Sequence, residues 1–141
     1  MKLGIPVYDG INLLDVAGPL EMFTWVDEEK GLQPLLLSID GASVLSLNKV
    51  RFEVHASFAA APELDVLWVP GGGPIALGNM MADANSPYIA YLRQVAENAK
   101  WVCSVCEGGT PAGTCRTARW AYRNHILEVR GLPAPFSRNH G

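Results

Sequence analysis

Short apolar blocks alternate with longer amphipathic segments along this chain. Five blocks have the length of strands, and most are continuous apolar runs: residues 2–8, 34–39, 50–55, 65–70 and 101–105. Residues 13–26 and 87–100 instead space their apolar side chains as helices do, the second behind the N-cap candidate Ser86. Because Pro19 lies inside the first of these segments, that helix is expected either to begin there or to kink there. Strands that alternate with helices predict an α/β fold with a mostly parallel sheet and helices on both faces.

Three loops that follow predicted strands carry the candidate chemistry, namely residues 9–15, 71–73 and 106–109. Sites in parallel sheets form at the carboxyl ends of the strands, so we expect these loops to meet there. Cys106 stands where a buried strand gives way to a glycine-rich segment, which is typical of a nucleophile on a sharp strand-to-helix turn. The N–H groups of a following helix would lower the pKa of such a thiol and stabilise the thiolate. A simple buried thiol is an alternative of equal weight.

The other two loops offer oxyanion donors and a proton-transferring group. The run Gly71-Gly72-Gly73 can bring backbone N–H groups close to a substrate, although it could also be only the turn that enters a helix. Asp15 could act as the acid or base. Judged on sequence grounds alone, Asp15 is better explained as a helix N-cap.

Cys103 and Cys106 have the C-x-x-C spacing of a redox dithiol. Cys103 falls inside a predicted strand rather than at a helix start, which argues against that role. Cys115, His125 and His140 could add metal ligands, but their spacing matches no zinc pattern. We therefore predict neither a metal site nor a cofactor.

Length and composition fit one globular domain. The chain has 141 residues, of which 49% are apolar and 18% are charged, enough to fill a core. No apolar stretch approaches the roughly 18 residues of a membrane span, and the N-terminus lacks the features of a signal peptide. Three cysteines argue against a disulfide framework, and a net charge of −3 argues against nucleic-acid binding. We expect a cytoplasmic protein that binds a small molecule and neither membrane nor nucleic acid.

The charge is unevenly distributed along the chain. Residues 1–107 hold six Lys and Arg against thirteen Asp and Glu, whereas residues 108–141 hold five Arg, no Lys and a single acid, Glu128. The second segment also has five Gly, three Pro and only four Ile, Leu or Val residues. The first segment is therefore predicted to be the folding unit, and the second to differ from it in kind.

Three stretches of the sequence form an ordered set of motifs. They are Leu13-Leu14-Asp15-Val16-Ala17-Gly18-Pro19-Leu20-Glu21-Met22-Phe23, then Asp65-Val66-Leu67-Trp68-Val69-Pro70-Gly71-Gly72-Gly73, then Cys103-Ser104-Val105-Cys106-Glu107-Gly108. In this order and spacing they resemble the DJ-1/PfpI superfamily, and most closely its isonitrile hydratase-like branch. The resemblance runs from residue 1 to about residue 108. It implies a flavodoxin-like, three-layer α/β sandwich that forms a homodimer.

The same resemblance implies roles for individual residues. Cys106 would be the nucleophile, Asp15 its acid/base partner, and amides near Gly72 in Gly71–Gly73 the oxyanion donors. In the isonitrile branch the thiolate attacks the terminal carbon of R–N≡C, an acid protonates it, and water releases an N-substituted formamide. Glu107 stands where the characterised hydratases have threonine, so it is a candidate substrate contact that leaves the substrate open. The alternative function is a non-enzymatic ligand-binding or redox-sensing domain that uses Cys106.

The resemblance stops after residue 108. The family continues there with an apolar helix, whereas this chain has Gly109-Thr110-Pro111-Ala112-Gly113-Thr114-Cys115-Arg116-Thr117-Ala118-Arg119-Trp120. Shifting the degenerate codons of this stretch by one base permits Ala-Leu-Leu-Leu-Ala-x-Ala-Gly-Leu-Leu-Asp-Gly, which is the family pattern. We therefore predict that residues 1–108 form a partial DJ-1/PfpI-like domain, incomplete at its C-terminus. Residues 109–141 are predicted to be a basic tail read out of frame, with truncation impairing activity; a divergent tail is the alternative.

Overall fold

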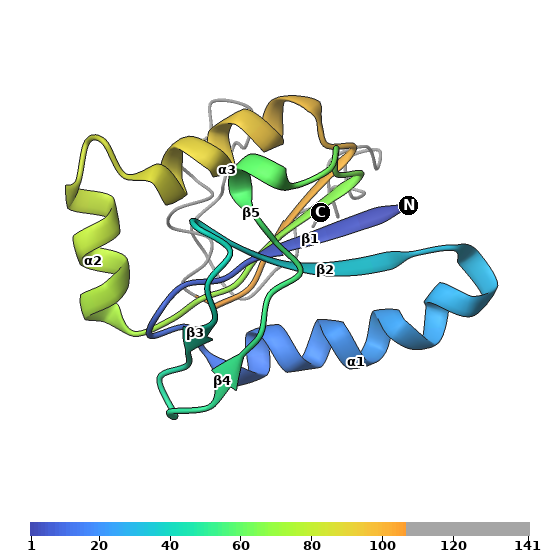
Figure 1. Cartoon of the computed structure of the whole chain (residues 1–141), viewed down its shortest axis with the longest axis horizontal. Helices are drawn as coiled ribbons and strands as arrows, with labels where there is room; N and C mark the ends of the chain where they lie inside the picture. Colours follow the sequence, from blue (N-terminus) through green and yellow to red (C-terminus); the bar gives the residue numbers. More distant parts are fainter. Residues whose placement is uncertain (107–141) are drawn as a thin grey trace, which may run out of the picture.

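The chain folds around a parallel sheet that has helices on both faces (Figure 1). The computed structural model describes residues 1–106, apart from the side chains of residues 26–30, so the predicted out-of-frame tail lies outside the described residues. The elements follow in chain order: β1 (Lys2–Pro6), α1 (Leu13–Lys30), β2 (Gln33–Ser38), β3 (Val44–Leu45), β4 (Arg51–Phe52), β5 (Ala56–Ser57), the short 3-10 helix η1 (Phe58–Ala60), β6 (Val66–Val69), α2 (Pro74–Ala82), α3 (Pro87–Asn98) and β7 (Trp101–Ser104).

The strand order sets where a site can form. The five-stranded sheet has the order β5-β2-β1-β6-β7, and every neighbouring pair is parallel. The chain moves from β1 to β2 on one side and later crosses to β6 on the other side, so the order reverses beside β1. Such a switch point, at the carboxyl ends of the strands, is where open α/β sheets bind ligands. In Figure 1 α1 lies beneath the sheet and α3 above it, which makes three layers.

The core is centred on β1 and on the helix that covers it. Residues 3–6 of β1 are all buried, because a central parallel strand covered on both faces must be apolar on both. Tyr88 of α3 is fully buried and meets the ring of Tyr8 edge-on at a centroid distance of 5.0 Å. The Tyr88 hydroxyl donates to the backbone oxygen of Pro6 at 3.3 Å. These contacts fix α3 over the carboxyl end of β1.

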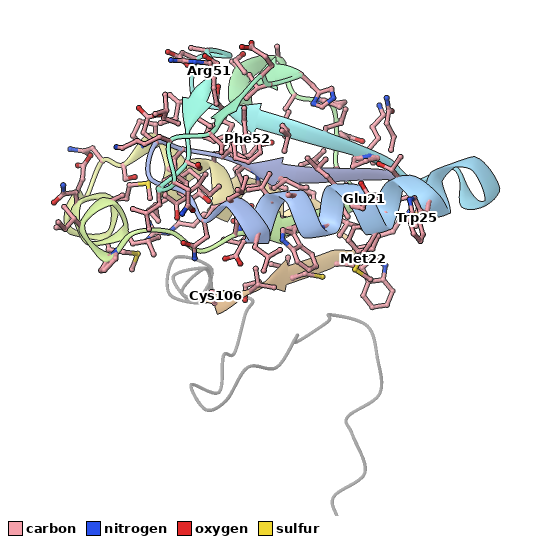
Figure 2. The ribbon with its side chains drawn as sticks, turned by 90° about the horizontal axis from the view of Figure 1, so that it is seen from below. Glu21, Met22, Trp25, Arg51, Phe52 and Cys106 are labelled. Atoms are coloured by element: carbon pink, nitrogen blue, oxygen red, sulfur yellow. The ribbon has the colours of Figure 1, made fainter. Side chains whose placement is uncertain are left out.

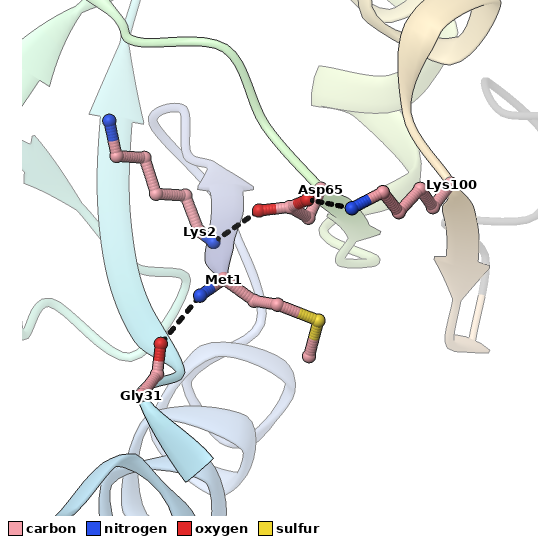
Figure 3. A network of polar contacts seen from close by, with 5 residues as sticks. All are labelled: Met1, Lys2, Gly31, Asp65 and Lys100. Atoms are coloured by element: carbon pink, nitrogen blue, oxygen red, sulfur yellow. Dashed lines mark hydrogen bonds and ion pairs between the residues drawn. The ribbon is translucent and has the colours of Figure 1, made fainter.

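A polar network joins the amino ends of the strands, opposite to the end that α3 covers (Figure 3). Lys100 Nζ lies 2.7 Å from Asp65 Oδ1, and the backbone N–H of Lys2 donates to Asp65 Oδ2 at 2.9 Å. The hydrogen bond from Lys100, followed by that from Lys2, lowers the pKa of Asp65 below its ordinary value. The network thereby joins the beginning of β1 to the residues that precede β6 and β7.

Helix α1 is apolar on more than one side. Val16 is fully buried, and Leu20 and Phe23 pack against the core. Met22 and Trp25 are 70% and 77% exposed and project from the flank of the helix in Figure 2. This distribution explains why the apolar positions of the segment follow a helical period only loosely.

Four of the five predicted strands and both predicted helices are present, with three corrections. The strand predicted over residues 50–55 is wrong for most of its length, because only Arg51–Phe52 form β4, which pairs with β3 outside the main sheet, and the edge strand beside β2 in the main sheet is β5. The first predicted helix does not begin at Pro19, because α1 begins at Leu13 and continues through the proline. Helix α2 was not predicted: it has only nine residues, it is apolar on most sides, and Gly78 lies inside it, so its sequence shows no clear helical period. Ser86 caps α3 as predicted, its hydroxyl accepting the N–H of Ile89 at 3.4 Å. No helix in residues 1–106 is both long and apolar enough to cross a membrane.

Candidate active site

The three predicted loops meet at the carboxyl edge of the sheet. Asp15 lies in the first turn of α1, Gly71–Gly73 follow β6, and Cys106 follows β7. The backbone N–H of Asn12 donates to Gly71 O at 3.0 Å. The N–H of Gly73 donates to Gly10 O at 2.8 Å, so two hydrogen bonds hold the first loop against the second. A third link comes from the β3–β4 hairpin, where Leu45 O accepts the N–H of Gly10 at 2.8 Å.

Cys106 has a backbone conformation that its side chain disfavours. Its φ is +47°, in the left-handed region that residues with a side chain seldom occupy. Strain of this kind is typical of a nucleophile held on a sharp turn after a strand. The thiol is exposed and donates to Asp15 Oδ1 at 3.3 Å, although 91 residues separate the two along the chain. The fold therefore brings the predicted nucleophile and its predicted acid/base partner into contact.

Both carboxylate oxygens of Asp15 have donors. Oδ2 accepts the backbone N–H of Gly71 at 2.9 Å and the side-chain amide of Asn12 at 3.4 Å, while Oδ1 accepts the Cys106 thiol. The N-cap explanation of Asp15 is wrong, because α1 begins two residues earlier at Leu13. The carboxylate is thus directed at the neighbouring loops rather than at the first N–H groups of its own helix.

The three glycines have different partners. The N–H of Gly71 binds Asp15, and the N–H of Gly73 binds Gly10 O. The N–H of Gly72 has no hydrogen-bond partner among residues 1–106, so of the three candidate oxyanion donors it alone is uncommitted there. A Cβ at position 72 would overlap the Tyr8 hydroxyl and lie 2.9 Å from Gly10 O, which is why only glycine fits.

Two further residues contact Asp15 that the sequence did not single out. Asn12 binds the carboxylate, and the indole Nε1–H of Trp68 donates to the backbone carbonyl of Asp15 at 3.1 Å. Trp68 lies in β6 and packs edge-on against Phe23 of α1, with ring centroids 5.8 Å apart. The sequence contained one signal for the Trp68 contact: Pro19, four residues after Asp15, has no N–H to donate to the carbonyl of Asp15.

The second cysteine differs from the first in its surroundings. Cys103 lies inside β7 as predicted and is buried, and this burial raises the pKa of its thiol. Within residues 1–106, no disulfide joins the two cysteines. Glu107 and the candidate ligands Cys115, His125 and His140 lie outside the described residues. Over residues 1–106, no three His, Cys, Asp or Glu side chains are grouped as a metal site would require.

Sequence comparison assigns this arrangement to a known family. The DJ-1/PfpI family pattern matches residues 1–116, so the resemblance extends beyond its predicted end at about residue 108. The chain belongs to the DJ-1/PfpI family. Among characterised relatives, the isonitrile hydratase of Pseudomonas putida is 26% identical over 140 residues, an alignment that covers 94% of this chain and 58% of the hydratase. The chain therefore spans a little over half the length of that relative.

Solved structures of the DJ-1/PfpI family share the fold. A ThiJ/PfpI family protein from Pseudomonas syringae matches with a TM-score of 0.69 and 27% identity, over 79% of this chain and 44% of that protein. A DJ-1 superfamily protein from Agrobacterium tumefaciens matches with a TM-score of 0.60 and 15% identity, over 81% of this chain and 59% of that one. The described residues thus have the three-layer α/β sandwich that the sequence motifs predicted.

Proposed function

We propose that this protein is a cysteine-dependent hydratase of small molecules that converts isonitriles to N-substituted formamides. The observation that carries the proposal is the contact between an exposed, strained cysteine and a carboxylate, Cys106 Sγ to Asp15 Oδ1 at 3.3 Å. The similarity to an isonitrile hydratase supports the choice of substrate class. In the proposed reaction a thiolate attacks the isonitrile carbon, and that carbon must then gain a proton. Cys106 would supply the nucleophile and Asp15 the proton.

The first half of the proposed reaction joins the substrate to the enzyme. The Cys106 proton moves to Asp15, and the resulting thiolate forms a C–S bond to the terminal carbon of R–N≡C. Asp15 returns the proton to that carbon, which gives the thioimidate R–N=CH–S–Cys106. We assign the stabilisation of negative charge on the substrate to the N–H of Gly72, because the N–H groups of Gly71 and Gly73 already have partners.

The second half releases the product and regenerates the enzyme. Asp15 takes a proton from water as the water oxygen bonds to the thioimidate carbon, and the substrate nitrogen receives that proton. The C–S bond then breaks, the hydroxyl proton passes to the departing sulfur, and R–NH–CHO leaves. The sum is one isonitrile plus one water giving one formamide, with Cys106 and Asp15 returned to their starting states.

Turnover of a simple isonitrile by the 141-residue chain tests the proposal. Formamide formation should be lost in Cys106→Ser, because a serine hydroxyl is not ionised near neutral pH. It should fall strongly in Asp15→Asn, which keeps the shape of the side chain but cannot transfer the proton. Cys103→Ser is the matched control: its thiol is buried, so formamide production should stay close to that of the unmodified chain.

Two outcomes would contradict the proposal. Equal losses in Cys103→Ser and Cys106→Ser would favour a dithiol. Reversible oxidation of Cys106 without any formamide would favour a redox-sensing domain, which an exposed thiol hydrogen-bonded to a carboxylate also allows.

A further inference from the structure

The backbone carbonyl of Asp15 lacks its normal helical partner. In an α-helix the carbonyl of a residue accepts the N–H of the residue four positions later. Asp15 is the third residue of α1, and the residue four positions later is Pro19, which has no N–H. The proline ring also crowds that carbonyl and turns it away from the helix axis. The sequence therefore leaves the acid/base candidate in a turn of helix that cannot be closed in the usual way.

The sheet supplies the missing donor. Trp68 Nε1–H donates to Asp15 O at 3.1 Å, in a partly buried position. The edge-on contact with Phe23, two turns further along α1, keeps the indole ring between strand and helix. The hydrogen bond to Asp15 thus comes from a rigid strand rather than from the helix itself.

The same short segment also holds the side chain of Asp15. Trp68 binds the backbone carbonyl, and Gly71, three residues later, binds the carboxylate Oδ2 at 2.9 Å. Because residues 68–71 bind both the backbone carbonyl and the carboxylate Oδ2 of Asp15, the direction of the remaining oxygen, Oδ1, is fixed. That direction leads to Cys106, which follows the strand paired directly with β6, with Trp68 opposite Cys103.

We propose that Trp68 is a positioning residue for Asp15, and that it is needed because Pro19 removes the helical donor. The inference rests on the proposed function only in taking Asp15 as the proton-transfer partner of Cys106. Without the indole N–H, the first turn of α1 is free to shift, and Asp15 Oδ1 moves out of hydrogen-bonding position with the Cys106 thiol. A helix with an N–H at position 19 would not need the indole.

A set of four variants of the 141-residue chain tests this dependence. Trp68→Phe removes the N–H and keeps an aromatic ring against Phe23, whereas Pro19→Ala restores the N–H that closes the helical turn. The double variant Pro19→Ala/Trp68→Phe combines the two, and Asp15→Asn is the reference for loss of the partner. The readout is the pH profile of Cys106 alkylation by iodoacetamide, with the modified residue identified by peptide mass spectrometry. This readout needs no isonitrile turnover, so it can fail or succeed independently of the proposed function.

The expected pattern is a shift of the alkylation profile that the second substitution reverses. Trp68→Phe should move the midpoint of the profile toward that of Asp15→Asn and change the alkylation rate by about two- to tenfold, the factor that one hydrogen bond of ordinary net strength corresponds to. Pro19→Ala alone should match the unmodified chain, and the double variant should return to that profile. A Trp68→Phe chain that fails to fold while the double variant folds with the unmodified profile would support the same hydrogen bond.

Three results would overturn the inference. One is a Trp68→Phe profile identical to that of the unmodified chain. Another is a change in the alkylation profile that persists in the double variant, which would mean that the Trp68 ring acts through packing and not through its N–H. The third is a double variant that does not fold.

Discussion

Adding one methyl group to the second glycine of the loop after β6 should destabilise the protein and disturb its site. Gly72 is buried, and a Cβ built on it would overlap the Tyr8 hydroxyl and lie 2.9 Å from Gly10 O. Tyr8 cannot swing aside freely, because it is 6% exposed and its ring packs edge-on against Tyr88. Gly10 is equally constrained, since its φ is +88° and its carbonyl accepts the N–H of Gly73. The strain of Gly72→Ala must therefore be absorbed by the backbone.

The size of the effect follows from the cost of overpacking. Forcing an extra methyl group into a closely packed position typically costs about 1–3 kcal/mol. Gly78→Ala is the matched control, because a Cβ there has nothing within 4 Å and the residue lies inside α2. Replacing a glycine inside a helix by alanine stabilises by roughly 0.5–1 kcal/mol. The two Gly→Ala changes, only six residues apart, should thus have opposite signs.

Urea unfolding followed by tryptophan fluorescence measures both changes. Gly72→Ala should lower the midpoint and Gly78→Ala should raise it, with the slope of the transition unchanged. The rate of Cys106 alkylation should change in Gly72→Ala only, because its loop holds Asp15 through Gly71. The reasoning is refuted if Gly72→Ala unfolds at the same urea concentration as the unmodified chain, or if Gly78→Ala is the less stable of the two.

Three further predictions concern other parts of the chain. Tyr91→Phe should stabilise the protein by about 1 kcal/mol in urea unfolding, because the Tyr91 hydroxyl is buried without a hydrogen-bond partner among residues 1–106. The substitution keeps the aromatic ring, which stacks on Phe58 with the ring centroids 3.9 Å apart. An unchanged or lower unfolding midpoint would contradict this prediction. Burial raises the pKa of Tyr91 to about 12, above its ordinary value of 10, so the stability of the protein should fall as the pH rises from 10 toward 12, and Tyr91→Phe should flatten that decline. Lys100→Met should destabilise the protein slightly at neutral pH, because it removes the ion pair with Asp65. Below the lowered pKa of Asp65 the variant should be as stable as the unmodified chain, because the carboxyl group is then protonated in both the folded and the unfolded state. A difference in stability that persists in acid would contradict the ion pair. We also propose that residues 109–141 are read out of frame: a one-base change near codon 108 should give a longer, more soluble protein, and equal solubility of the two products would argue for a divergent tail.

The sequence alone determined the fold class and the identity of the site loops. Apolar blocks of strand length alternating with amphipathic segments leave few arrangements other than a parallel sheet between helices, because each element must bury its apolar face. The rule that sites lie at the carboxyl ends of such strands then selected the loops that contain Asp15, Gly72 and Cys106. The Ser86 cap of α3 was also predictable, because capping depends only on residues three positions apart.

Local patterns misjudged the places where tertiary contacts override propensity. A proline inside a helical segment allows either a helix start or a kink; α1 continues through Pro19, and the Trp68 indole binds the carbonyl of Asp15 that the proline leaves without a helical donor. Asp15 has the residue type of an N-cap, yet its carboxylate binds Gly71 and Cys106. In each case the deciding partner is more than 50 residues away, beyond the reach of any local periodicity.

Only the tertiary structure decided which backbone donors and which thiol of the candidate site are available. The sequence offered three equivalent glycines, and pairing of the loops commits the N–H of Gly71 to Asp15 and that of Gly73 to Gly10, leaving Gly72. It placed Cys103 inside a strand but left open whether Cys106 is a buried thiol, and the turn after the strand exposes Cys106. These distinctions depend on the direction of individual N–H groups and side chains, which chain order does not encode and which the packing of β6 between its neighbours fixes.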